Sequence, residues 1–190
     1  MFRHELLWCS IVALAAAPCS VLAQPYAEED RDWGIAATSA LRRPPYTAPT
    51  PTRIAGGNVL TTTALNRMLQ SGTRPTLIDV ASGEGHVSIA GARWIPGAGH
   101  GTHFLDPLQS LMKERLARLS GGDLSMPIVF FCVNSQCWLS YNAALRAIAL
   151  GYSQVFWYRG GIEAWRRAGL PLARVAPAPA LDAPQPQNKN

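Results

Sequence analysis

Short apolar runs alternate with longer segments of helical periodicity in the middle of the chain. The runs TLIDV at 76–80, PIVFFC at 127–132 and QVFWY at 154–158 are rich in β-branched and aromatic residues, without regular polar alternation. Strands buried on both faces of a sheet have this pattern. A further short run, ARWIP at 92–96, stops at a proline. We therefore predict strands at these four places.

Four other segments repeat their apolar residues every three or four positions, which predicts helices with one buried face. They cover residues 61–72, 107–119, 138–150 and 162–170, and Gly151 stands where the third should stop. The apolar positions that carry the pattern are Leu65, Met68 and Leu69 in the first helix and Leu108, Leu111, Met112, Leu116 and Leu119 in the second; Leu145, Ile148 and Ala149 in the third are expected to point inward.

Strands separated by helices indicate an α/β protein with a central parallel sheet of about five strands and helices on both faces. In such a sheet the functional crevice lies beyond the carboxyl ends of the strands. The segments placed there are 81–86, 97–103, 132–137 and 158–161. We expect the residues that contact a ligand to come from these segments.

The first 23 residues differ from this middle part. Arg3 lies near the start, an apolar stretch follows, and small residues precede Gln24. These features predict a secretory signal peptide, 1–23, that is cleaved before Gln24. A membrane anchor is the alternative, but Pro18 and Ser20 interrupt the apolar stretch. We therefore expect a periplasmic protein, with no membrane attachment after cleavage.

Composition divides the rest of the chain into three parts. Residues 24–53 are polar and rich in proline, which predicts an extended arm around a core. Residues 54–172 form the expected domain, and residues 173–190 have few side chains to bury, which predicts a disordered tail. The net charge of +5 is spread thinly, without a basic stripe among aromatic residues. Nucleic-acid binding is therefore not expected.

Two cysteines survive the expected cleavage, and both lie in the stretch FFCVNSQCW. In an oxidising compartment two neighbouring thiols rarely stay unpaired and unused. Cys132 follows the most apolar strand, and Cys137 lies near the first turn of the next helix. Backbone amides of such a loop and the positive end of the helix stabilise a thiolate. The pair is therefore the candidate reactive site.

Four interpretations of the pair compete. A structural metal site needs about four ligands, and only His86, His100 and His103 are candidates, so we expect no metal. A purely structural disulfide would close a short loop and contribute on the order of 2 kcal/mol. A redox-active pair is the third, and a persulfide carrier, with Cys132 as the attacking sulfur and Cys137 as its resolving partner, is the fourth. The residues leave the last three open.

Two stretches resemble the signatures of rhodanese-like domains. LIDV followed by IAGARWIPG is similar to the first signature, and GYSQVFWYRGGIEAWRRAGLPL is similar to the closing one. The resemblance covers residues 54–172 and implies a sulfurtransferase fold. It also implies that Cys132 takes sulfane sulfur from thiosulfate or a related small donor. Cys137 stands where an arginine is common in this family, and Ala81 replaces another arginine.

The resemblance implies a substrate-binding role for the residues around the cysteines. Without a cation in the loop, an anionic donor would be held by backbone amides and by Arg159, while Trp138 would shield one side. The loop interior that would line the donor site consists of Val133, Asn134, Ser135 and Gln136.

The stretches RRPPYTAPTPTRIAGG and CWLSYNAALRAIALGY resemble a narrower, exported group of rhodanese-like proteins. That group carries a double-cysteine-tryptophan motif and is associated with alcohol catabolism that depends on pyrroloquinoline quinone (PQQ). The resemblance implies an accessory role beside a quinoprotein alcohol dehydrogenase or its cytochrome, without a cofactor bound to this chain. The alternative is a non-enzymatic binding or chaperone module in which Cys132 and Cys137 form a structural disulfide.

Three other positions have expected structural roles. Asp79 in LIDV is interpreted as an acid bonded to loop amides rather than as a catalytic base. Gly160 and Gly161 should permit a tight turn beside the cysteine loop. Trp165 is expected in the core.

Overall fold

The computed structural model describes residues 28–83 and 86–176. The expected signal peptide, 1–23, lies outside the described residues, and so does the tail beyond residue 176. Within the described part, none of the helices has the length and apolar character needed to cross a membrane.

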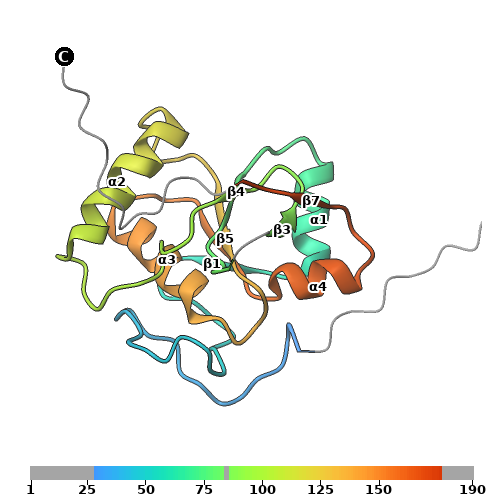
Figure 1. Ribbon diagram of the computed structural model, residues 1–190, viewed down its shortest axis with the longest axis horizontal. Coiled ribbons are helices and arrows are strands. Elements are labelled where there is room, and N and C mark those ends of the chain that lie inside the picture. The colour runs from blue at the N-terminus through green and yellow to red at the C-terminus, as the bar shows by residue number, and fades with distance from the viewer. Residues whose placement is uncertain (1–27, 84–85, 177–190) are drawn as a thin grey trace, which may run out of the picture.

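A five-stranded parallel sheet forms the centre of the domain, with strand order β1-β6-β5-β2-β4. Helices α2 and α3 lie on one side of it and α1 and α4 on the other (Figure 1). The predicted fold class is therefore confirmed. The strands are β1 (Asn58–Leu60), β2 (Thr76–Asp79), β4 (Arg93–Trp94), β5 (Ile128–Phe131) and β6 (Val155–Tyr158), and the helices are α1 (Thr62–Gln70), α2 (Pro107–Ser120), α3 (Trp138–Ala149) and α4 (Gly161–Arg167).

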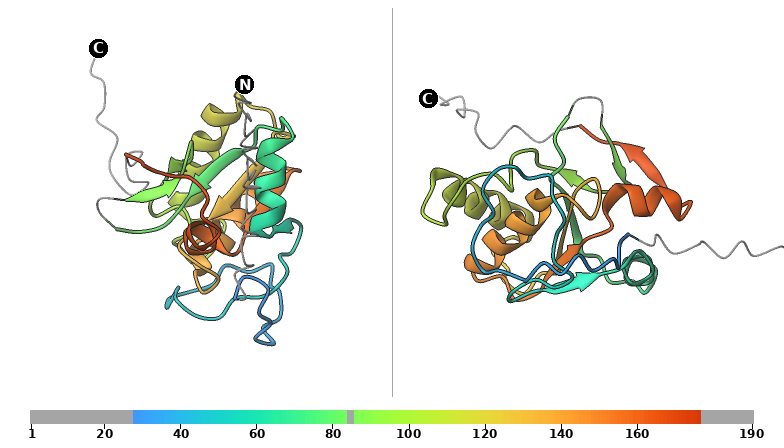
Figure 2. Two further views of the ribbon diagram at one scale, coloured as in Figure 1. Left: turned by 90° about the vertical axis from the view of Figure 1, so that its right-hand side faces the viewer. Right: turned by 90° about the horizontal axis from the view of Figure 1, so that it is seen from below.

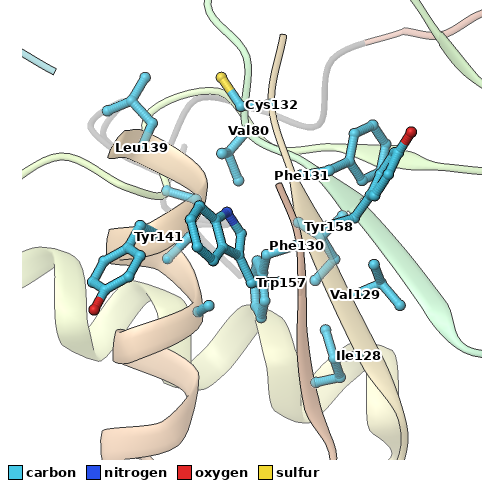
Figure 3. Packing of buried hydrophobic residues seen from close by; sticks show 14 of the residues in the cluster. Val80, Ile128, Val129, Phe130, Phe131, Cys132, Leu139, Tyr141, Trp157 and Tyr158 are labelled. Atoms are coloured by element: carbon cyan, nitrogen blue, oxygen red, sulfur yellow. The ribbon is translucent and has the colours of Figure 1, made fainter. Parts of the chain in front are cut away.

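Strand β5 lies in the middle of the sheet, and all four of its residues are buried. Its register places Phe130 beside Trp157 and Phe131 beside Tyr158 of β6. Because successive side chains of a strand point to opposite faces, these two pairs fill the core on the two sides of the sheet. On the α3 side, Tyr141 packs edge-on against Trp157, with ring centroids 5.0 Å apart (Figure 3).

Local signals fix where the helices start and stop. The hydroxyl of Thr61 accepts a hydrogen bond from the Ala64 amide at the start of α1. Asp106 caps α2 in the same way, and Pro107 occupies its first turn. Gly121, with a φ of 62°, ends α2 in the left-handed conformation. These are the capping residues that helix termini favour, so the positions of these helix ends can be predicted accurately from the sequence.

Three strands of the structure were not predicted. β1 extends the sheet beyond β6, and β3 (Val87–Ile89) pairs with β7 (Leu172–Arg174) in a separate antiparallel sheet. The pairing places Ala173 and Arg174, which we expected in the tail, in β7. Each strand has three residues, which is too short for a periodic pattern to emerge.

The expectation that Ala149 points inward is also wrong. Ala149 is exposed and Ile148 is half-buried, whereas Leu145 is buried as expected. Ala149 is the last residue of α3; the C-cap Leu150 follows, and then Gly151, with a φ of 93°. The helix therefore ends too soon to cover this position.

Residues 28–53 pass over α3 and the cysteine loop without forming a helix (Figures 1 and 2). We call this segment the arm. Thr47 forms an isolated antiparallel bridge with Cys137, and the side chains of Tyr141 and Asn142 bond the arm backbone at Thr38 and Arg42. The arm thus contacts the beginning of α3 and the second cysteine.

Candidate functional site

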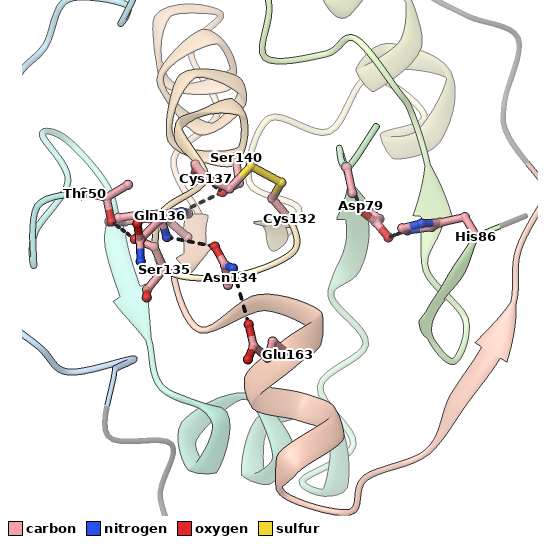
Figure 4. Close-up of a disulfide and its surroundings, with 12 residues drawn as sticks. Thr50, Asp79, His86, Cys132, Asn134, Ser135, Gln136, Cys137, Ser140 and Glu163 are labelled. Atoms are coloured by element: carbon pink, nitrogen blue, oxygen red, sulfur yellow. Dashed lines mark hydrogen bonds and ion pairs between the residues drawn. A yellow bond between two sulfur atoms is a disulfide. The ribbon is translucent and has the colours of Figure 1, made fainter. Parts of the chain in front are cut away.

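A disulfide joins Cys132, directly after β5, to Cys137, the N-cap residue of α3 (Figure 4). The two Cα atoms are 6.2 Å apart, within the usual range for a disulfide. The strand and the helix therefore bring together the two sulfurs that the sequence singled out. Bond formation is compatible with both the structural and the redox-active interpretation.

The two cysteines differ in exposure. Cys132 is 2% exposed, whereas Cys137 is half-buried. Cys132 continues the buried strand β5, where the amide of Val80 bonds the carbonyl of Phe131 alongside it. The role of Cys132 as the attacking sulfur stays a prediction, but its burial does not favour direct approach by a partner. Cys137 is the more exposed residue of the pair.

The amides at the end of the cysteine loop already have partners. Those of Gln136 and Cys137 donate to the Asn134 side chain (3.0 Å) and carbonyl (3.2 Å), and that of Trp138 donates to the Tyr46 carbonyl (2.8 Å). An anionic donor would have to displace these bonds. The expected cradle of free amides is therefore not found on this side of the loop.

The four interior residues of the loop have different surroundings. Val133 is 44% exposed and is the most exposed of the four. The Asn134 amide group donates to Glu163 (3.3 Å), and the carbonyl of half-buried Gln136 accepts from the arm. Ser135 is buried, and its hydroxyl has no hydrogen-bond partner. A shared substrate-binding role for all four therefore does not fit their positions.

Arg159 does not face the cysteines as an anion-binding residue. It is 2% exposed, and its guanidinium donates to the Arg31 carbonyl (2.7 Å), the Thr50 carbonyl (3.1 Å) and the Glu29 carbonyl. It also lies 4.7 Å from the ring centroid of Trp33. Burial lowers the pKa of Arg159, against the raising effect of nearby arm carboxylates. Arg159 therefore fastens the arm, which corrects its expected role.

Trp138 is likewise covered. It is 2% exposed, its indole donates to the Pro49 carbonyl (3.1 Å), and the guanidinium of Arg42 lies 5.1 Å from its ring centroid. An edge contact with Tyr141 completes its surroundings. Trp138 therefore packs under the arm and does not line an open site beside the disulfide.

Asp79 is confirmed as a structural acid. Its carboxylate accepts hydrogen bonds from the Ala81 amide (2.8 Å) and the Ser88 hydroxyl, and it pairs with His86 (Figure 4). The His86 ring stacks on Trp94, with centroids 4.5 Å apart. The convergence of His86 and Ser88 on this carboxylate could not be predicted, because the small β3–β7 sheet that positions them was not predicted.

The two glycines after Arg159 form the expected tight turn beside the cysteine loop. Gly161 has a φ of 63°, and a Cβ atom there would overlap the backbone of Cys132 and Val133. The next two amides, of Ile162 and Glu163, donate to the carbonyls of Cys132 (3.0 Å) and Val133 (2.9 Å). Helix α4 thereby fixes the beginning of the loop. Trp165 is buried, as predicted.

The segment 97–103 lines an apolar cavity of about 300 Å³ with the first turns of α2. Beneath it, the guanidinium of buried Arg146 donates to the Asp106 carboxylate (2.6 Å). Burial raises the pKa of Asp106, but the bond to Arg146 and its charge outweigh this effect and lower it. Across residues 28–83 and 86–176, no group of three or more His, Cys, Asp or Glu side chains could hold a metal ion.

Comparisons with known proteins point to one family. A family model described as "Rhodanese-like domain" matches residues 61–168, more than half of the chain. A thiosulfate sulfurtransferase from Pseudomonas aeruginosa is 19% identical over 64% of this chain, with a TM-score of 0.48, and the match spans 21% of that protein. A search of curated proteins found no match.

Two further solved structures are similar. The polysulfide-sulfur transferase homodimer from Wolinella succinogenes is 18% identical, with a TM-score of 0.44, over 62% of this chain and 79% of its own. A rhodanese-like domain from Anabaena sp. is 17% identical, with a TM-score of 0.44, over 72% of this chain and 89% of its own.

Proposed function

Because this chain belongs to the rhodanese-like domain family, we propose that it performs thiol–disulfide exchange or sulfur transfer through Cys132 and Cys137. The observation that carries the proposal is the disulfide in the loop between β5 and α3. A disulfide that is partly open to solvent can be attacked by a thiolate, which begins exchange. Sulfur transfer begins after that reduction, when a free cysteine thiolate attacks the sulfane sulfur of the donor.

The surroundings of the loop favour thiol–disulfide exchange over transfer from thiosulfate. Thiosulfate is an anion, yet the loop interior holds no cation, and Arg159 is committed to the arm. Exchange with a thiol needs neither a cationic cradle nor free amides; it needs one sulfur that a thiolate can reach. Half-buried Cys137 meets that requirement.

The proposed setting is the periplasm, beside PQQ-dependent alcohol oxidation. The signal-like first 23 residues support the location, and the resemblance to the exported group supports the association. A thiol of a quinoprotein alcohol dehydrogenase or of its cytochrome would then be the partner. The chain would act as an accessory protein that does not bind the quinone itself.

A second candidate is a binding or chaperone module with a structural disulfide. The burial of Cys132 and the cover that the arm provides over Trp138 favour it. In that case the bond would only hold the loop between β5 and α3. Redox behaviour separates the two candidates.

The test is a redox titration of the protein purified from the periplasm after expression of the full chain. Free thiols are counted at each potential, and circular dichroism follows the fold. We expect reversible reduction at about −270 to −120 mV, the range of dithiol oxidoreductases, with the fold retained. A pair that resists mild reductant until the protein unfolds would instead support the structural disulfide.

Mass spectrometry then separates exchange from sulfur transfer. Reduced protein is incubated with a sulfane sulfur donor and mapped for a gain of one sulfur atom. A sulfur carrier of the family type retains the added sulfur on Cys132 in the Cys137→Ser variant and loses it in Cys132→Ser. If neither variant gains a sulfur atom while the wild-type pair is reduced and reoxidised reversibly, the chain performs exchange alone.

A further inference from the structure

We propose that Cys137, and not the strand-end Cys132, is the sulfur that bonds to the partner in the mixed disulfide. Cys132 leaves from Cys137 when the partner attacks and, in the reverse reaction, attacks Cys137 to release the partner. The inference rests on the proposed function and names the entry point of that chemistry. It reverses the roles that the resemblance implies for the two cysteines.

Exposure is the first observation. A thiolate must approach the disulfide along its bond, from the side of the sulfur it attacks. Cys132 is 2% exposed, and Figure 3 shows it at the upper end of the core cluster, near Val80. Helix α4 holds its carbonyl through the Ile162 amide, so the loop does not readily turn this residue outward. Cys137 is the half-buried member of the pair.

The position of Cys137 on α3 is an independent observation. It is the N-cap residue, with extended backbone (φ −101°, ψ 105°), and its side chain makes no capping hydrogen bond in the disulfide form. N-cap side chains ordinarily accept from the amides two or three positions later, at the positive end of the helix. α3 is twelve residues long. Once reduced, Cys137 can place its thiolate at this positive end, which stabilises the negative charge.

The surroundings of Cys132 work in the opposite direction. Its neighbours in the core are apolar, and Val80 and Ala81 of the adjacent strand end are fully buried. A partner thiolate therefore does not reach Cys132 easily, whereas the Cys137 sulfur lies within bonding distance of it.

The reaction balances with a dithiol as the co-reactant. One thiolate of the dithiol attacks Sγ of Cys137; the Cys132–Cys137 bond breaks, and its electron pair leaves on Cys132, which takes up a proton. The second thiol of the partner loses its proton and attacks its own sulfur in the mixed disulfide, which releases Cys137 as a thiolate. The partner is oxidised to a disulfide, and the pair is reduced. In the reverse reaction the Cys137 thiolate attacks the partner disulfide, whose other sulfur leaves and takes up a proton; Cys132 then loses its proton and attacks Cys137, which releases the partner sulfur as a thiolate.

The experiment compares the alkylation rates of the two thiols. The variants Cys132→Ser and Cys137→Ser, purified from the periplasm, each retain one cysteine of the pair and need no reduction. Both are treated with iodoacetamide at one pH, and peptide mapping by mass spectrometry follows each site. We expect Cys137 to react faster by at least an order of magnitude. Similar rates in urea would show that the difference arises from the fold.

A second measurement uses the native disulfide. Oxidised wild-type protein is exposed to glutathione, quenched with acid, and mapped for mixed disulfides. We expect glutathione on Cys137. Faster alkylation of Cys132, or glutathione found mainly on Cys132, would overturn the inference.

The two measurements also separate the inference from the proposed function. A pair that resists reduction contradicts the proposed function, but the single-cysteine variants still report which thiol is the more reactive.

Discussion

Two buried arginines hold irregular segments against the same domain, but they do so with different partners. Arg146 on α3 bonds the Asp106 carboxylate (2.6 Å), the Gln109 side chain (2.8 Å) and the His100 carbonyl (2.8 Å). Arg159 after β6 bonds only neutral groups of the arm, as far as its described contacts show.

We call each arginine with its bonded partners a clamp. The difference in partners determines the effect of removing either arginine. Removing Arg146 leaves a carboxylate with 13% side-chain exposure against the protein, without its counter-charge. Removing Arg159 leaves arm carbonyls without a donor. If the arm detaches, these carbonyls can accept hydrogen bonds from water, so little further stability is lost. The Arg146 clamp therefore stabilises the whole domain against unfolding, whereas the Arg159 clamp stabilises the contact between the arm and the domain.

The largest effect should follow from Arg146→Met. We expect the free energy of unfolding to fall by about 3–5 kcal/mol, since breaking a buried ion pair leaves an uncompensated charge. Urea denaturation measures it. The double variant Arg146→Met with Asp106→Asn should lose less than the sum of the two single changes. Additive losses would mean that the two side chains do not act as a pair.

Arg159→Met should have a smaller and more local effect. We expect a loss of about 1–3 kcal/mol and faster proteolysis within residues 28–53, because the arm loses its main anchor. Limited proteolysis with mass spectrometry locates the cuts. Arg159→Lys is the control, since it keeps the charge without the planar fork of donors. Cuts spread evenly over the domain would contradict a local clamp.

A fall in pH should weaken the contribution of Asp106 to stability and strengthen that of Glu29 in the arm. The pKa of Asp106 is lowered in the folded protein, so its stabilisation is present above about pH 4 and is lost as the pH falls through the folded value. Burial raises the pKa of Glu29 in the arm, against the lowering effect of its bonds to Thr62. Its contribution is therefore greatest below about pH 4 and is lost as the pH rises through the folded value.

Hydrogen exchange and urea unfolding distinguish these trends. After correction for intrinsic exchange, arm amides should be better protected at pH 4 than at pH 7, and Glu29→Gln should flatten this dependence. Unfolding free energy should fall below pH 4 in the wild type and less steeply in Asp106→Asn. Arm protection that grows with pH in the wild type would contradict the assignment to Glu29.

The smallest effect should come from Trp138→Phe. The indole hydrogen bond to Pro49 is lost while most of the ring remains, so we expect a loss of about 1 kcal/mol and a modest rise in proteolysis of the arm. Trp165→Phe is the matched control, since it loses a similar bond to Pro171, away from the arm. Equal loosening of the arm by both changes would contradict the role of Trp138.

The accuracy of prediction depended on how far along the chain the deciding contacts reach. The longer elements and the burial of Trp165 follow from local periodicity, and Asp79 could be interpreted from its place at a strand end. The role of Arg159 could not be predicted, because its partners lie more than 100 positions earlier, in a segment without periodic pattern. The burial of Cys132 depends in the same way on Val80 and on α4, which only the folded sheet places beside it.

The spacing of the two cysteines has a consequence for folding. They are five positions apart, whereas Asn58 pairs with Phe156 to complete the sheet. Closing so short a ring requires little chain ordering, while the parallel crossovers demand much more. The disulfide can therefore form or break before the sheet folds without changing the strand order. Oxidation of the two cysteines can then precede or follow folding.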